Sequence, residues 1–146
     1  MMYFDTAYIA KCYLPEPGSK CVQELARSGQ DGLCCSEWGR LELFSVFHRH
    51  LREGRISRDE LMDVVAVFRE DEADGVWTWF SMKPSQLRSV ANQFVEMPDD
   101  IFLRAGDALH LRSAVVNGLN EIYTSDRHLL AAAAYFGIKG TNVIEQ

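Results

Sequence analysis

The chain has 146 residues, of which 47% are hydrophobic and 25% are charged. This length and apolar share suit one compact core, so we expect a single domain spanning residues 1–146. The formal net charge of -6 argues against a surface built to neutralise phosphates. That argument weakens if the negative charge is concentrated in a cation-filled pocket. A basic stretch does occur, formed by Arg49, Arg52, Arg55 and Arg58, although a solvated helix face is the commoner explanation of such a run.

Apolar runs stay well short of the ~20 residues that a membrane span needs, and no basic region precedes an apolar stretch at the N-terminus. We therefore expect a cytoplasmic protein without membrane contact. The cysteines show no CxxC spacing, which favours structural thiols over a zinc site. His48 and His50 lie two residues apart on an expected helix, so they point to different sides and cannot share a metal ion.

Short apolar runs alternate along the chain with longer segments of helical period, which predicts an α/β domain with a mostly parallel sheet. The expected strands are 2–4, 33–35, 76–80, 122–124 and 142–144.

The expected helices fill the intervals between these strands. After the second strand, residues 37–52 form a predicted helix, Glu53 and Gly54 break it, and Ser57 is the expected cap of the next helix. In that next helix, Leu61, Val64, Val65 and Phe68 have the spacing of a buried stripe, which would pack on the core or on a partner. Further helices are predicted around 87–95, over 102–116 and over 129–136, the last ended by Gly137.

Four acids stand out by their positions in this scheme. Ligands of parallel α/β domains bind at the carboxyl ends of strands, where Asp5 follows the first strand and Asp126 follows the fourth. Glu42 lies inside an apolar helix, and Asp107 lies among small and apolar neighbours in a later helix. If the four converge, they form a strongly acidic cluster.

Each acid also has a purely structural explanation. Asp5 and Asp126 stand where an acid caps a helix N-terminus, and capping alone would explain either of them. A carboxylate inside an apolar helix is costly unless it is paired or metal-bound, so Glu42 and Asp107 could instead form buried ion pairs. The candidate partners are Arg40, Arg104 and Arg112. We interpret His110, three residues after Asp107, as an ordinary surface histidine, with a supporting role at the site as the alternative.

A converged cluster would have a definite chemistry. Two carboxylates ~4 Å apart repel by about 4 kcal/mol at an effective dielectric near 20, so the cluster would bind protons or cations. Oxygen-only ligands select Mg²⁺ or Mn²⁺, which can activate water and hold a scissile phosphate. Neither a Walker-type phosphate loop nor a GxGxxG turn is present. The cluster therefore predicts phosphodiester hydrolysis.

Four segments, in the same order, resemble the PIN-domain ribonucleases, and within them the VapC-type toxins of bacterial toxin-antitoxin pairs. They are YFDTA at 3–7 with KCYLPEPG at 11–18, SEWGRLE at 36–42, DALHL with SA at 107–114, and TSDRHL at 124–129. The third is the most specific, and the resemblance runs nearly end to end. Ala7 departs from the family, in which a serine is frequent at that position.

The resemblance implies a three-layer α/β/α PIN-like domain with endoribonuclease activity on RNA. It implies that one or two Mg²⁺ or Mn²⁺ ions are bound by Asp5, Glu42, Asp107 and Asp126. Thr6 and Ser125 would then be hydroxyls that orient carboxylates or water. It also implies a cognate antitoxin that covers a hydrophobic groove and blocks the acidic pocket, and a homodimer. The apolar residues of 38–47 and 61–68 could serve these interfaces, with packing inside the domain as the alternative.

Two alternatives to this function keep the same fold. One is a non-catalytic PIN-like binding domain, although all four acids are retained. The other is a metal-dependent DNA nuclease, because no residue is assigned to a 2′-hydroxyl contact. A receiver-type signalling domain fits poorly, since the third strand ends in Phe80, Ser81 and Met82, without the required aspartate.

Overall fold

A computed structural model describes residues 1–144 as a five-stranded, all-parallel sheet in the order β3-β2-β1-β4-β5. The strands are β1 Met2–Phe4, β2 Leu33–Ser36, β3 Trp77–Phe80, β4 Glu121–Tyr123 and β5 Lys139–Thr141. Four predicted strands are confirmed to within one residue at each end. The prediction of the fifth, at 142–144, is wrong by three residues.

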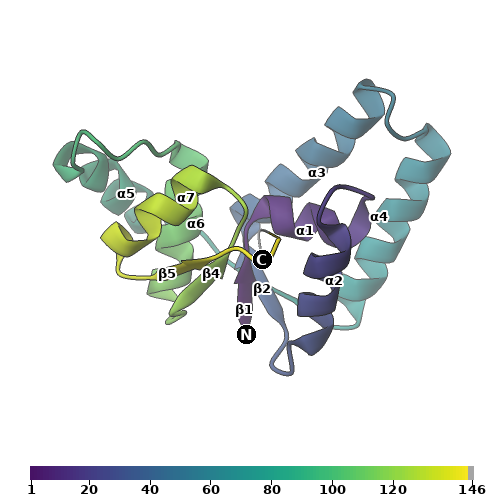
Figure 1. The fold of residues 1–146 in the computed structure, drawn as a ribbon, viewed down its shortest axis with the longest axis horizontal. Helices are drawn as coiled ribbons and strands as arrows, with labels where there is room; N and C mark the ends of the chain where they lie inside the picture. The colour runs from purple at the N-terminus through teal and green to yellow at the C-terminus, as the bar shows by residue number, and fades with distance from the viewer. Residues whose placement is uncertain (145–146) are drawn as a thin grey trace.

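Helices cover both faces of this sheet. They are α1 Thr6–Tyr13, α2 Ser19–Ser28, α3 Glu37–Arg52, α4 Arg58–Ala73, α5 Pro84–Glu96, α6 Ala105–Val116 and α7 Arg127–Ala133, the last continued by a 3-10 turn, η1 Ala134–Phe136. Figure 1 shows α1 to α4 on one side of the strands and α5 to α7 on the other. The predicted three-layer α/β/α class is therefore confirmed. Over residues 1–144, none of the helices combines the length and apolar character that a membrane span requires.

Local sequence explains the helical hairpin on one face. The Ser57 hydroxyl accepts from the backbone N–H of Glu60, and the Glu60 side chain accepts from the N–H of Ser57, each at 3.1 Å. This reciprocal capping fixes the start of α4, as predicted. Phe68 of α4 is fully buried against the core, so the predicted apolar stripe packs inside the domain.

The chain leading into α6 differs from the prediction. Residues 102–104 were expected to be helical, but α6 begins only at Ala105, and Arg104 has an extended backbone at φ -83°, ψ 157°. In this segment Leu103 is only 8% exposed, whereas its neighbour Phe102 is 58% exposed. The buried Leu103 thus fixes the segment on the core and leaves Phe102 at the surface.

The strand order reverses at β1. The chain runs outward from β1 through β2 to β3, and then returns to place β4 on the other side of β1. In open α/β sheets such a reversal opens a crevice at the carboxyl ends of the two central strands. Asp5 follows β1 and Asp126 lies just beyond β4, so both acids lie at this crevice.

Candidate active site

All four predicted acids line one cavity of about 350 Å³. They come from the end of β1 (Asp5), from α3 (Glu42), from α6 (Asp107) and from the turn after β4 (Asp126). Arg49 and Arg104 line the same cavity. Four segments that are distant in sequence therefore place their carboxylates around one space.

Asp5 and Asp126 are helix caps as well as cavity residues. Asp5 Oδ1 accepts from the N–H of Tyr8 at 2.9 Å, at the start of α1. Asp126 Oδ1 accepts from the N–H groups of His128 and Leu129 at 2.7 and 3.1 Å, at the start of α7. The capping explanation is thus correct for both. It does not compete with a role at the cavity, because each cap occupies one carboxylate oxygen.

Thr124 connects these two acids. Its hydroxyl donates to Asp5 Oδ2 and accepts from the N–H of Asp126 at 2.9 Å. Within residues 1–144, the neighbouring Ser125 makes no hydrogen bond to a carboxylate. The hydroxyl that positions these acids in the structure is therefore that of Thr124, while the proposed role of Ser125 stays a prediction.

Burial sets the protonation of Asp5. The residue is 5% exposed, and burial raises the pKa of its carboxyl group to about 6, although the hydrogen bonds from Thr124 and Tyr8 lower it. Burial also raises the pKa of Asp107, and the negative charges of Asp126 and Glu42 add to this effect. Both groups would release their protons more readily beside a cation.

Glu42 is held by hydrogen bonds. Its Oε1 accepts from the Thr6 hydroxyl at 2.9 Å and lies 2.7 Å from His110 Nε2. Burial would raise the pKa of Glu42, but the bonds from His110, Thr6 and Trp38 outweigh burial and lower it. The contact predicted between Thr6 and a carboxylate is therefore present.

The arginine pairs considered for Glu42 and Asp107 do not form in the part of the chain that the structure describes. Arg40 pairs instead with Glu72, at 2.6 Å. Arg104 only lowers the pKa of Asp107 from a distance. The charge opposite Glu42 is His110.

The prediction that His110 is a surface residue is wrong. The side chain is 2% exposed, and its Nδ1 lies 3.0 Å from the hydroxyl of Tyr3. Burial would lower the pKa of His110, but Tyr3, Cys35 and Glu42 outweigh burial and raise it well above the ordinary value of 6.5. A protonated ring can donate from both nitrogens, to Glu42 and to Tyr3, which fixes its orientation.

Two glycines allow α3 and α6 to approach at this point. A Cβ atom at Gly39 would overlap Cys35 Sγ and would lie 2.8 Å from His110 Cε1. A Cβ atom at Gly106 would lie 3.2 Å from Glu42 Oε2. The small residues noted beside the acids in sequence are thus required by close packing of the two helices.

The candidate metal ligands are carboxylate oxygens, which are the ligands that Mg²⁺ and Mn²⁺ prefer. Within the described chain, however, no three His, Cys, Asp or Glu side chains lie close enough together to hold one ion. Mutual repulsion of carboxylates keeps such side chains apart when no cation separates them. An ion would have to draw them inward.

A larger cavity of about 520 Å³ lies elsewhere, between α1, α2 and the starts of β2 and β3. Its polar groups bond to each other: Tyr13 donates to Asp71 at 2.5 Å and accepts from Trp77 Nε1 at 2.7 Å. Asp71 is the one carboxylate among its lining residues. This cavity therefore lacks the acid cluster that distinguishes the smaller one.

The fold is shared with a solved toxin structure. VapC20 of Mycobacterium tuberculosis, described as a sarcin-ricin loop cleaving toxin, matches with a TM-score of 0.71 and 15% sequence identity. The match covers 90% of this chain and 95% of the other. At this identity the similarity establishes the fold, which is the one expected from the sequence resemblance. The sequence itself matches no protein-family model and no curated protein.

Proposed function

We propose that this protein is a Mg²⁺- or Mn²⁺-dependent endoribonuclease of the VapC toxin type. The observation that supports this most directly is the gathering of Asp5, Glu42, Asp107 and Asp126 around one cavity, at the strand-order reversal of a fold shared with VapC20. Capping accounts for Asp5 and Asp126 one at a time, but it does not explain why they share a cavity with Glu42 and Asp107. Burial disfavours the ionised forms of Asp5 and Asp107 there, and the charges of Asp126 and Glu42 add to this at Asp107.

In this proposal the four acids hold the metal ion. A bound divalent ion would lower the pKa of a water molecule and stabilise charge on the scissile phosphate. Thr124 fixes Asp5 relative to Asp126, while Thr6 and His110 fix the carboxylate of Glu42. These contacts orient the side chains of Asp5, Asp126 and Glu42 toward the cavity, while Asp107 is left to adjust to the ion.

The arginines of the cavity would act on the substrate rather than on the ion. Arg49 and Arg104 are exposed at the cavity, one from α3 and one from the segment before α6. Guanidinium groups bind phosphate oxygens in a bidentate manner. The two side chains are therefore suited to hold the RNA backbone over the acids.

The test is cleavage of defined structured RNAs by purified protein in Mg²⁺ or Mn²⁺, with chelator as a control. Asp107→Asn should abolish cutting without unfolding the protein, since it removes a charge that its neighbours repel. Asp63→Asn, which changes an exposed acid on α4, is the matched control and should cut normally. Equal cutting by wild type and Asp107→Asn, or cutting in chelator, would reject the proposal.

The same assay separates the alternatives. Cutting of a DNA strand of the same sequence, with RNA left intact, would identify a DNA nuclease. Metal-independent binding of RNA without any cutting would identify a non-catalytic binding domain.

The proposal includes an antitoxin and a homodimer as partners. Within the two segments suggested by the sequence, Leu41, Met62 and Val67 are exposed apolar residues that a partner could cover. Sedimentation of the purified chain tests the homodimer. Inhibition of cleavage by a co-expressed small protein that binds this surface, and its loss in Met62→Glu, tests the antitoxin.

A further inference from the structure

We infer that Phe102, held in place by His128, is a stacking platform for an unpaired RNA base near the acid cavity, with Arg104 and Arg127 binding the adjoining phosphates. This inference rests on the proposed ribonuclease function and names the form of RNA that the site would accept.

Phe102 is exposed but held in place. It is 58% exposed, while Leu103 beside it is buried in the core. Its ring lies against the ring of His128, with centroids 4.6 Å apart and planes inclined at 61°. A single exposed aromatic residue is common on protein surfaces and needs no function by itself. What distinguishes Phe102 is that its ring is fixed by a neighbour from another element, so a base could stack on it at little entropic cost.

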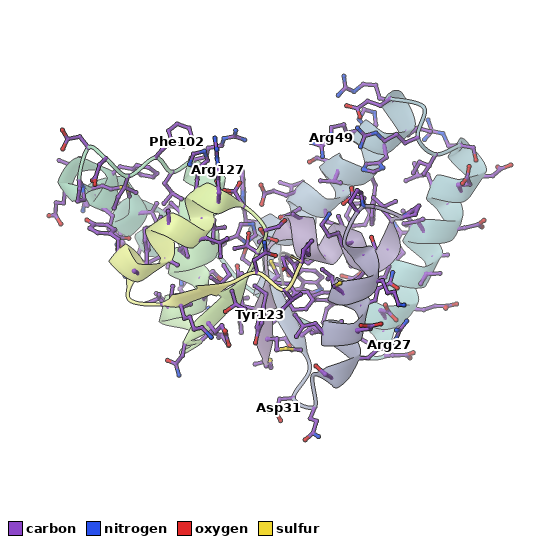
Figure 2. The ribbon with its side chains drawn as sticks, in the orientation of Figure 1. Arg27, Asp31, Arg49, Phe102, Tyr123 and Arg127 are labelled. Carbon is purple, nitrogen blue, oxygen red and sulfur yellow. The ribbon has the colours of Figure 1, made fainter. Side chains whose placement is uncertain are left out.

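The position of this ring relative to the cavity is the second observation. Arg104, two residues after Phe102, lines the cavity that contains the four acids. Leu103 between them is buried, whereas Phe102 and Arg104 are both exposed, so both side chains leave the core toward solvent. His128, whose ring Phe102 contacts, donates its backbone N–H to Asp126, one of the four acids. Figure 2 shows Phe102 next to Arg127, and shows Arg49 facing them from α3.

The charge around this ring is the third observation. Arg49, Arg104 and Arg127 are all exposed, and within residues 1–144 none of them forms an ion pair. Arg49 and Arg104 line the acidic cavity and Arg127 lies beside Phe102 (Figure 2), on a chain whose net charge is -6. A basic rim of this kind suits a polyanion that passes over the cavity.

Cationic side chains beside an aromatic ring are the combination by which proteins bind single-stranded nucleic acid. Bases within an RNA duplex are stacked on each other and cannot reach such a ring, whereas bases in loops and bulges can. The geometry therefore favours a cleavage site with an unpaired neighbouring nucleotide. Because every base has a stacking face, little preference for base identity is expected from this contact.

The test is binding of RNA in Mg²⁺ by protein that also contains Asp107→Asn, so that the RNA stays intact. Two probes are used: an unpaired oligonucleotide with 2-aminopurine at successive positions, and the same sequence in a duplex. Phe102→Ala and Phe102→Leu should both weaken binding of the unpaired RNA, by roughly 5- to 150-fold. Phe102→Trp should restore binding. Quenching of one 2-aminopurine position should be present with Phe and Trp and absent with Ala and Leu.

The controls isolate the stacking contact. Phe102→Leu keeps an apolar side chain against His128 but has no aromatic face, and Phe94→Ala removes an exposed ring from α5. Binding of the unpaired RNA should be normal in Phe94→Ala, and duplex binding should not differ among the Phe102 variants. Normal binding and quenching in Phe102→Leu would overturn the inference, as would absence of RNA binding by the parent protein.

Cleavage measured separately distinguishes this inference from the proposed function. Stacking that depends on Phe102 without any metal-dependent cutting would reject the ribonuclease and keep the RNA site. Cutting of unpaired RNA that is equally fast in the wild type and in the Phe102→Leu variant would keep the ribonuclease and reject the stacking platform.

Discussion

Replacing Asp5 by asparagine should stabilise the metal-free protein at neutral pH. Burial raises the pKa of this carboxyl group from the ordinary 3.8 to about 6. A difference of about two pKa units corresponds to roughly 3 kcal/mol of unfavourable free energy when the group is ionised. Asparagine caps helices as well as aspartate does, so the bond from Tyr8 survives. The bond from Thr124 must rearrange, at about 1 kcal/mol, which leaves a net gain of roughly 2 kcal/mol.

The gain should depend on pH in a defined direction. Below about pH 3 the carboxyl group of Asp5 is protonated in both the folded and the unfolded chain, so the wild type has no charge to bury there. As pH rises from 4 to 6, the carboxyl group ionises readily in the unfolded chain but not in the folded one. The free energy of unfolding of the wild type therefore falls over this range. Denaturant unfolding of both proteins between pH 4 and 8, with chelator present, should therefore show a gap that opens over this window and stays constant above it.

Divalent ions should reverse the order of the two proteins. At an Mg²⁺ concentration about 100 times the dissociation constant, binding to the folded state adds about 2.7 kcal/mol to the stability of the wild type. Asp5→Asn removes one of the proposed ligands and should gain much less. If the asparagine variant is less stable than the wild type at pH 8 in chelator, the ionised carboxylate stabilises the fold and the reasoning about its burial is refuted.

Three further changes test the contacts around the cavity. His110→Ala should lower the free energy of unfolding by roughly 3 kcal/mol below pH 6.5, because it removes the charged partner of Glu42. This loss should shrink as pH rises through the raised pKa of the histidine. A loss of stability that does not change with pH would mean that the buried ring is neutral. Gly39→Ala should cost roughly 2 kcal/mol in thermal or denaturant unfolding, because its Cβ atom would overlap Cys35 Sγ of β2 and crowd His110 of α6. An unchanged midpoint would contradict the close approach of α3 to β2 and α6. Thr124→Val should slow RNA cleavage by roughly 10- to 100-fold while the fold is retained, since it frees Asp5; wild-type rates would show that this hydroxyl is dispensable.

Local sequence determined the elements that were predicted well. Ser57 and Glu60 are three residues apart and specify the start of α4 without help from the rest of the chain. The last strand was misplaced because Val143 and Ile144 are the apolar residues there, whereas β5 is formed by Lys139, Gly140 and Thr141. Pairing with β4 decides that register, and glycine suits position 140 because a Cβ atom there would lie 3.2 Å from the α7 backbone. Neither contact is local.

The candidate site shows the same difference between features set by local sequence and features set by long-range contacts. The four acids could be selected from sequence because each stands at a strand end or in an apolar helix. His110 was misjudged because its burial depends on the packing of α6 against β1, β2 and α3, through Tyr3, Cys35 and Gly39. One signal is present in the sequence: the residues on both sides of His110 are apolar, and histidine is intermediate in burial rather than a typical surface residue. Thr124 was passed over because its importance depends on two hydrogen bonds across β1 and β4.

The net charge of -6, which opposed a nucleic-acid function at first, becomes consistent with it once the charges are located. The four proposed ligands line one cavity together with Glu16, whose charge is paired with Lys11 and His50. Arg49 and Arg104 line the same cavity, and Arg127 lies beside Phe102 (Figure 2). Two divalent ions in the cavity would cancel the charge of the four acids and leave these arginines as the dominant charges facing the solvent there. RNA affinity should therefore rise with Mg²⁺ even in a protein that cannot cut. Affinity that is independent of Mg²⁺ at constant ionic strength would show that the acid cavity and the arginine rim do not act on the same ligand.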